Sequence, residues 1–124
     1  MALNRCVFTG RLTRDPELKY SPDGIPVCRF TLAVDRPTKE READFIDFVA
    51  FRQPAEFVAN YLTKGRLAEA DGRLQIRDYQ KQDGSRGRAV EIIVDRVGAL
   101  DKPKHTDAPG DAHAGNAPET VYTE

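Results

Sequence analysis

The chain contains 124 residues, of which 40% are hydrophobic and 31% are charged, and its formal net charge is −1. This length supports one domain with its own core, and the composition is typical of a globular protein rather than a disordered one. No apolar run approaches the roughly 20 residues that span a bilayer, and the first residues lack a signal-peptide pattern. We therefore expect a cytoplasmic protein with no membrane partner.

Cysteine and histidine usage gives no indication of a metal site or of any cofactor. Cys6 and Cys28 are the only cysteines, and both lie in apolar, strand-like runs. We expect two buried, reduced thiols, because disulfides are rare in the cytoplasm and a metal site needs further ligands. Both histidines lie in residues 102–124, away from these runs.

The first two predicted strands are residues 3–13 and 27–35, and turn signals fill residues 14–26 between them. The first strand begins with alternating apolar and polar side chains, and Gly10 within it indicates a bulge or a bend. The second strand alternates more regularly, and its expected core face carries Cys28, Phe30, Leu32 and Val34.

A third predicted strand, residues 43–53, follows a charged loop at residues 36–42. This strand is apolar almost throughout, and side chains two residues apart share a face. We assign one face to the core, with Ile46, Phe48 and Ala50. We interpret the opposite face as a working surface, with Phe45 and Phe51 on either side of Asp47.

Residues 53–65 have apolar side chains at helical spacing, so we predict one short amphipathic helix. Pro54 suits its first turn, Glu56 the positive N-terminal end, and Lys64 with Gly65 a stop.

Two further strands are predicted at residues 66–79 and 89–100, joined by a polar hairpin loop at 80–88. In the first, Gly72 permits a bend, Leu74 and Ile76 point one way, and the opposite face carries Arg73, Gln75, Arg77 and Tyr79. The last strand has an expected core face of Val90, Ile92 and Val94. Ile93 points outward and is a candidate subunit contact.

The predicted order is three strands, a helix and two strands, which is the order of the five-stranded OB barrel. We therefore predict an all-β fold with one short helix between the third and fourth strands. Residues 1–101 form this domain, and residues 102–124 form a flexible acidic tail with few large apolar side chains.

The outward residues are of the kinds that bind a single nucleic-acid strand. Guanidinium groups such as those of Arg73 and Arg77 contact phosphates, and rings such as that of Tyr79 stack on bases. Phe45 and Phe51 offer two more rings on a neighbouring strand. Each feature also has a plainer reading: the phenylalanines could pack under a loop or a subunit, the tyrosine could lie at a strand end in water, and the arginines could form a solvated surface.

An enzyme is the competing class, and the sequence gives it little support. No Ser-His-Asp or Cys-His pair is visible, and no phosphate-binding glycine loop is present. We therefore expect no catalytic residues.

The residues themselves resemble bacterial single-stranded DNA-binding proteins. The similarity covers residues 1 to about 100 in the right order and spacing. It is carried by Asn4-Arg5, Gly10-Arg11-Leu12-Thr13, Asp15-Pro16-Glu17, Phe30-Thr31-Leu32-Ala33-Val34, Ala43-Asp44-Phe45-Ile46, Pro54-Ala55-Glu56, Asn60-Tyr61-Leu62, Lys64-Gly65 and Asp71-Gly72-Arg73-Leu74.

The resemblance implies an OB fold, a homotetramer made of two dimers, and sequence-tolerant binding of single-stranded DNA in replication, recombination and repair. It implies no catalysis and a location at the nucleoid. The stacking rings of that family fall on Phe45, Phe51 and Tyr79. We predict phosphate contacts at Arg11, Arg52, Arg73, Arg77, Arg86 and Arg88. An OB module that binds protein or structured RNA is the alternative.

Three features depart from the family pattern. The loop at residues 36–42 has no aromatic residue, so one stacking platform is missing or is replaced by Arg36. The chain has no tryptophan. Its last residues lack the Ile-Pro-Phe tip with which relatives bind genome-maintenance proteins, so a specialised paralogue or a phage or plasmid copy fits as well as a housekeeping protein. We expect Asp47 to pair with a nearby arginine or to orient a base edge.

Overall fold

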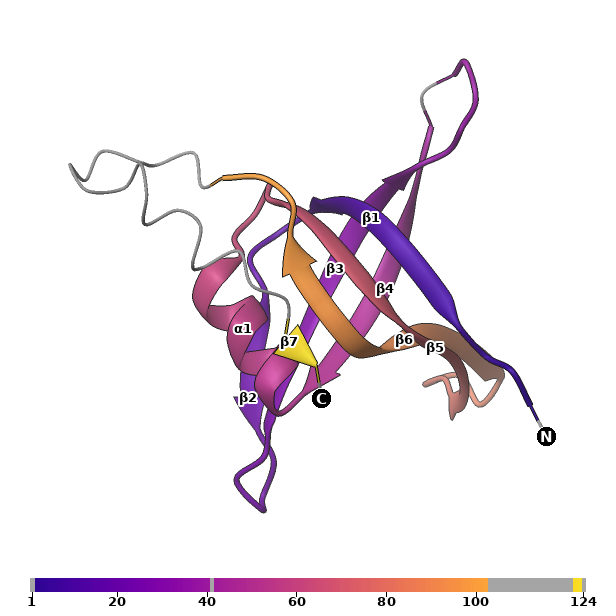
Figure 1. Cartoon of the computed structure of the whole chain (residues 1–124). Coiled ribbons are helices and arrows are strands. Elements are labelled where there is room, and N and C mark those ends of the chain that lie inside the picture. Colours follow the sequence, from indigo (N-terminus) through magenta and orange to yellow (C-terminus); the bar gives the residue numbers. More distant parts are fainter. Residues whose placement is uncertain (1, 41, 103–121, 124) are drawn as a thin grey trace.

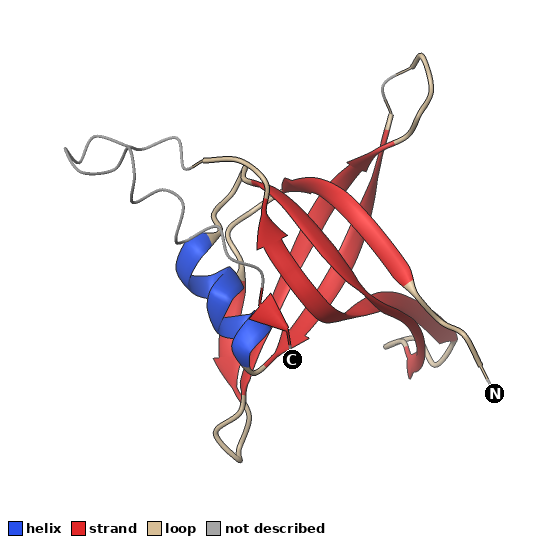
Figure 2. Ribbon diagram, in the orientation of Figure 1, coloured by secondary structure: helices blue, strands red, loops and turns tan. Residues whose placement is uncertain are grey.

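The computed structural model describes residues 2–40, 42–102 and 122–123. Their elements follow in the order β1 (Cys6–Leu12), β2 (Glu17–Tyr20), β3 (Pro26–Asp35), β4 (Ala43–Phe51), α1 (Gln53–Tyr61), β5 (Leu67–Gln80), β6 (Arg86–Ala99) and β7 (Tyr122–Thr123). Strands therefore dominate, and the helix lies between the third and fourth of the strands predicted from sequence (Figures 1 and 2). The predicted fold class is confirmed.

The strands form one sheet in the order β1-β5-β6-β4-β3-β2, and β1 also pairs with β3, which closes the sheet into a ring. The closing pairs are Arg11 with Ala33 and Leu12 with Leu32. β4 and β6 run parallel through the pair Phe48–Ile92, whereas the other pairings are antiparallel. This is the ring expected of a small OB-type barrel.

The interior of the ring is filled by the even-numbered side chains of β3 and β4, as their alternation predicted. Phe30 and Phe48 stack with ring centroids 5.1 Å apart, and Phe8 meets Phe48 edge-on at 5.6 Å. Helix α1 lies beside one end of the barrel and contributes Phe57 and Val58 to the same core (Figure 2). Other members of the core include Leu12, Cys28, Leu32, Ala50, Leu62, Ile92, Val94 and Val97.

Two glycines allow neighbouring strands to approach closely, Gly10 at the β1–β3 closure and Gly72 in the β5–β6 pair. A Cβ atom on Gly10 would lie 3.0 Å from the carbonyl carbon of Ala33, and one on Gly72 would lie 2.8 Å from the carbonyl carbon of Ile93. The β5–β6 register shifts between Asp71 and Gly72, so the predicted bend at Gly72 is confirmed as a bulge.

The two cysteines are free, with Cys28 buried and Cys6 partly buried. Burial in the core and, to a lesser extent, the nearby charge of Glu17 together raise the pKa of the Cys28 thiol to about 11, so this thiol stays protonated at neutral pH.

Several predicted boundaries were wrong. The helix ends at Tyr61 rather than at residue 65, because Leu62 already has an extended backbone with φ −109° and ψ 136°. β2 lies in the predicted loop at residues 14–26, since it is a short strand that pairs only with β3. The hairpin turn is also shorter than predicted: β6 begins at Arg86, so Arg86 and Arg88 lie on a strand rather than in a loop.

The β5–β6 hairpin extends beyond the barrel (Figure 1). Val90 was assigned to the core but is 49% exposed, and it does not belong to the core cluster of the described residues. Ile93 was a candidate subunit contact, yet it is only 6% exposed within a single chain.

The prediction of a flexible tail at residues 102–124 lies mostly outside the described residues. Tyr122–Thr123 form strand β7, which was not predicted and which pairs with Arg96 and Val97 of β6. Among the residues that the structure describes, no helix is long and apolar enough to cross a membrane.

Candidate nucleic-acid interface

Strands β3, β4, β5 and β6 share a continuous surface on the side opposite the core. The register pairs Thr31 with Asp47 and Ala33 with Phe45, and it pairs Arg77 with Ala89 and Tyr79 with Gly87. The pair Val49–Ile93 joins the two halves. We call this surface the outer face; its members used below are Arg29, Thr31, Phe45, Asp47, Phe51, Arg73, Arg77, Tyr79, Gly87 and Glu91.

The three predicted stacking rings all lie on the outer face. Phe45 is 71% exposed, Tyr79 is 44% exposed and Phe51 is half-buried. Tyr61, which is exposed to a similar extent as Tyr79, packs against Phe57 at 5.3 Å. Among the described residues, neither Phe45 nor Tyr79 has a ring partner of this kind. Their flat surfaces are therefore open to a further planar group.

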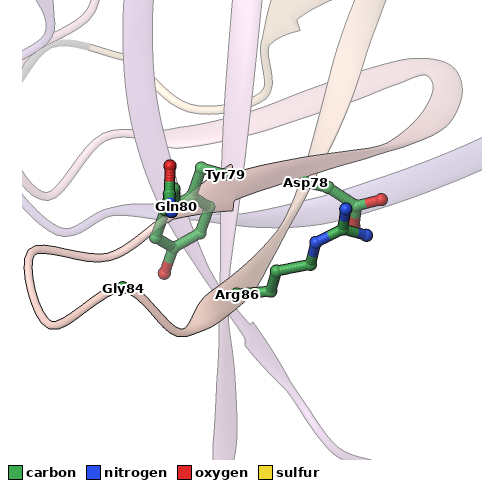
Figure 3. Close-up of a pocket in the computed structure, with 5 residues that line it drawn as sticks. All are labelled: Asp78, Tyr79, Gln80, Gly84 and Arg86. Carbon is green, nitrogen blue, oxygen red and sulfur yellow. The ribbon is translucent and has the colours of Figure 1, made fainter.

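Tyr79 lies near the end of the β5–β6 hairpin, beside a cavity of about 440 Å³. Asp78, Gln80, Gly84 and Arg86 also line this cavity. Arg86 extends away from the turn that contains Gly84 and towards Asp78 (Figure 3). The hairpin thus presents a ring next to a hollow large enough for a nucleobase.

Glu91 lies between two arginines of the outer face. Its carboxylate accepts a hydrogen bond from Arg29 at 3.2 Å and forms an ion pair with Arg77 at 3.8 Å. The Glu91 side chain is 9% exposed, whereas both arginine side chains are 53% exposed. One carboxylate therefore fixes two cations, and most of their donors still face solvent.

Arg29 was not among the predicted site residues. Its position on β3 has the same parity as Thr31, and the register places it opposite Val49 of β4. The alternation of side chains along β3 could have identified Arg29, because it is the one basic residue of this strand and it lies on the outward side, next to β4.

Arg73 also lies on the outer face, opposite Ile93. Its side chain is exposed and has no ion pair or hydrogen bond among the described residues. Val49 and Ile93 are 2% and 6% exposed although they lie on this side of the sheet. The aliphatic stems of Arg29 and Arg73, their register partners, are long enough to cover such side chains while the charged ends stay in water.

Arg52 links the outer face to the helix. It follows Phe51, and its φ of 65° with ψ of −129° is a backbone conformation that side chains other than glycine rarely adopt. Its N–H donates to the carbonyl of Pro26 at 3.0 Å, and its own carbonyl accepts from Glu56 at 3.1 Å as α1 begins. The surrounding backbone therefore holds Arg52 at the edge of the outer face.

Asp47 has a partner on the outer face that the sequence reading missed. Its carboxylate accepts a hydrogen bond from the hydroxyl of Thr31 at 2.8 Å, across the β3–β4 pair. The expected arginine partner is not found among the described residues. A side-chain hydrogen bond between neighbouring strands fixes the carboxylate beside Phe45 without neutralising its charge.

Arg86 and Arg88 lie on the opposite side of the hairpin from Tyr79. The register pairs Gln80 with Arg86 and Asp78 with Arg88, which places both arginines on the face of Leu74 and Ile76. Arg88 also forms an ion pair with Asp78 at 3.3 Å. Of these two predicted phosphate contacts, Arg86 still lines the cavity beside Tyr79 at the end of the hairpin, whereas Arg88 does not.

Arg11 lies at the other end of β5, opposite Leu67. Its guanidinium donates to the carbonyl of Gly65 at 2.9 Å and contacts Asp101 at 3.4 Å. Asp101 also accepts from Arg66 at 2.8 Å and from the Leu67 amide at 3.2 Å. Burial raises the pKa of Asp101, but these hydrogen bonds and the two arginine charges outweigh it and hold the pKa below its usual value.

Arg36, the proposed substitute for a missing aromatic ring, is held by carboxylates. It contacts Glu42 at 2.6 Å and Asp44 at 2.8 Å. The hydrogen bond to Asp44 is the largest cause that raises the pKa of Arg36, and the same bond lowers the pKa of Asp44. The ion pairs fix the guanidinium plane at the base of this loop.

No group of three or more histidine, cysteine, aspartate or glutamate side chains suited to a metal ion occurs in residues 2–40, 42–102 and 122–123. The arrangement on the outer face is one of rings, arginines and hydrogen-bonded carboxylates. Such a surface can stack planar groups and bind phosphates.

Comparison with known proteins agrees with this reading. A family model described as the single-strand binding protein family matches residues 3–100. The chain is 50% identical to single-stranded DNA-binding protein 3 of Listeria innocua over 98% of this chain and 78% of that protein. It is 49% identical to the single-stranded DNA-binding protein of Halalkalibacterium halodurans, over 92% and 70% of the two chains. For single-stranded DNA-binding protein 2 of Staphylococcus aureus the identity is 52%, over 83% and 75%. The resemblance read from the motifs is thereby confirmed, and this chain belongs to the single-strand binding protein family.

Proposed function

We propose that this chain binds single-stranded DNA with little sequence preference and protects it during replication, recombination and repair. The observation that carries the proposal is the exposure of Phe45 and Tyr79 on the same side of the barrel as Arg29, Arg73 and Arg77. Bases stack on the rings and phosphates meet the guanidinium groups, and neither interaction depends on base identity. The outer face has no role in catalysis.

The arginines contribute unequally in this proposal. Arg73 has free donors and contacts phosphate directly, whereas Arg29 and Arg77 are positioned by Glu91 and use their remaining donors. Arg52 contacts the strand next to Phe51. Arg86 and Arg88 meet DNA only where it passes around the hairpin, and Arg11 contacts it only if its bonds to Asp101 and Gly65 give way.

Several copies of the chain bind one strand in this proposal, as a homotetramer made of two dimers. Val7, Ile76 and Val90 are 65%, 52% and 49% exposed, which is apolar surface that a single chain leaves uncovered. Light scattering should give the mass of four chains at micromolar concentration. A stable monomer under the same conditions would contradict the assembly without affecting DNA binding by each barrel.

We place the protein on the chromosome, at the nucleoid, because exposed single strands arise there. Contacts with genome-maintenance proteins would involve residues beyond 102, which lie outside the described residues apart from β7. A pull-down with the full chain and with a chain that ends at residue 102 would separate partners of the barrel from partners of the remainder.

The test of the proposal is a titration of labelled oligonucleotides followed by fluorescence anisotropy. A thymidine oligonucleotide should bind much more tightly than a duplex of the same length, and a mixed-sequence single strand should bind nearly as well. Equal affinity for single strand and duplex would contradict the proposal. Preference for folded RNA, or binding to neither strand, would favour a module for RNA or protein instead.

A further inference from the structure

Gly87 lies directly opposite Tyr79 in the β5–β6 hairpin, on the outer face. A Cβ atom added at Gly87 would lie 2.7 Å from the Tyr79 hydroxyl oxygen and 2.8 Å from its Cε2 atom, and nearer still to Cζ. The far half of the tyrosine ring therefore occupies the volume that any other residue at position 87 would fill with its own side chain. The Tyr79 ring can lie across β6 because its register partner, Gly87, has no side chain.

We propose that Gly87 is a positioning residue for Tyr79, which keeps the ring lying against the hairpin with its opposite surface turned to a nucleobase. The inference rests on the proposed function, because it assigns the ring to base stacking. It adds a residue that has no chemistry of its own. Gly87 acts only through the ring that it accommodates.

The far end of the Tyr79 ring lies against Gly87, and the residue as a whole is still 44% exposed. A ring held against the backbone has lost much of its rotational freedom before DNA binds, so less entropy is lost when a base stacks on it. With a methyl group at position 87, the ring must turn away from β6, and the base meets a side chain that moves.

The fold should tolerate this change. The atoms that a Cβ at Gly87 would meet belong to the far end of a side chain at the surface, whereas those at Gly10 and Gly72 include backbone atoms. Gly87→Ala should therefore give a folded protein with a rearranged ring. Gly24→Ala is the control, because it adds the same methyl group in the turn between β2 and β3, where nothing lies within 4 Å. Gly24 has φ 83°, so this control also strains its turn.

A double-mutant cycle with a thymidine oligonucleotide tests the inference. Tyr79→Ala should weaken binding about 5- to 150-fold, which corresponds to the usual contribution of one stacked base. Gly87→Ala should weaken binding by about 3-fold or more, and Gly24→Ala should leave it unchanged. In the Tyr79→Ala background, Gly87→Ala should have no further effect. An equal effect in both backgrounds, or none in the wild type, would overturn the inference.

A measurement without DNA separates this inference from the proposed function. A ring over Gly87 shifts the Gly87 Hα resonances upfield in the NMR spectrum, and Tyr79→Leu should remove that shift. If the Gly87 resonances do not change in Tyr79→Leu, the ring does not lie over Gly87. The inference then fails, whether or not the protein binds single-stranded DNA. If the shift is present but the wild type binds no single strand, the proposed function fails instead.

Discussion

The arginine just before β5 and the arginines in its second half have opposite surroundings. Arg66, which precedes the strand, is 7% exposed and donates to Asp101 and to the carbonyl of Tyr61, and Asp101 also contacts Arg11. Further along, Arg73 and Arg77 lie on a surface where most of the guanidinium donors face water. An arginine whose donors are taken up by the protein stabilises the fold, whereas one with free donors beside exposed rings is available to a ligand.

The largest expected effect comes from breaking the first of these two clusters. Arg66→Ala removes the hydrogen bonds that a buried guanidinium donates to Asp101 and to the carbonyl of Tyr61, which should cost about 3 kcal/mol in the free energy of unfolding. Urea denaturation measures this loss. At a temperature where the variant is still folded, its affinity for single-stranded DNA should match that of the wild type. A large loss of affinity in the folded variant would show that the two clusters are not separate.

Tyr79→Ala should have the reverse effect. We expect a loss of about 1–3 kcal/mol in binding free energy, because one base loses its stacking partner, with little change in stability. Tyr20→Ala is the matched control: Tyr20 is 62% exposed, but it lies on β2 with the parity of Leu18, which packs against the core. Anisotropy titrations of both variants make the comparison. Equal losses of affinity in Tyr79→Ala and Tyr20→Ala would contradict the assignment of the outer face as the DNA-binding surface.

The core face and the outer face of β3 and β4 could be predicted from the sequence, because the alternation of side chains along a strand does not depend on distant contacts. Phe48 and Ala50 had to face inward once Phe45 and Phe51 faced outward. The prediction failed at Val90, which belongs to a hairpin that extends beyond the core. Alternation gives the side of a strand on which a residue lies, but it does not say whether another element covers that side.

Other features depend on pairing that the sequence alone does not fix. Arg86 and Arg88 were grouped with Tyr79, yet the β5–β6 register places them on the reverse side. That register follows from the turn, where the Lys81 amide donates to the Ser85 carbonyl at 2.8 Å and Asp83 bonds Ser85. Arg11 had an outward parity, but its partner Asp101 lies far along the chain. The register depends on the exact turn geometry, which alternation does not give, and no local pattern could have revealed the contact between Arg11 and Asp101.

The arginines give a smaller effect, which appears in the salt dependence of binding. Arg73→Ala should lower the slope of log affinity against log salt by about 0.7, the value for one phosphate contact on a single strand. Arg88→Ala, on the reverse side of the same hairpin, should change this slope less. Titrations at four salt concentrations provide the slopes. If Arg88→Ala gives the larger change, the DNA lies on the reverse side of the hairpin. The assignment of the outer face as the binding side is then wrong.

The smallest expected effect is the acid sensitivity of the first cluster. The folded state holds the pKa of Asp101 below its usual value of 3.8, so the stabilisation is present above that value. It is lost as the pH falls through the lower pKa of the folded state. The stability of Asp101→Asn should therefore fall less on acidification than that of the wild type. Thermal melts recorded from pH 5 down to below 3.8 measure this difference. The same pH dependence in both proteins would show that other carboxylates govern it.

The central claim, that a single DNA strand lies on the outer face, can be tested by photo-crosslinking. A thymidine oligonucleotide with scattered 5-bromodeoxyuridine is bound, irradiated and digested, and the crosslinked peptides are identified by mass spectrometry. We expect crosslinks at Phe45, Phe51 and Tyr79. Crosslinks confined to Tyr20 and Tyr61, with none on the three rings of the outer face, would contradict the claim.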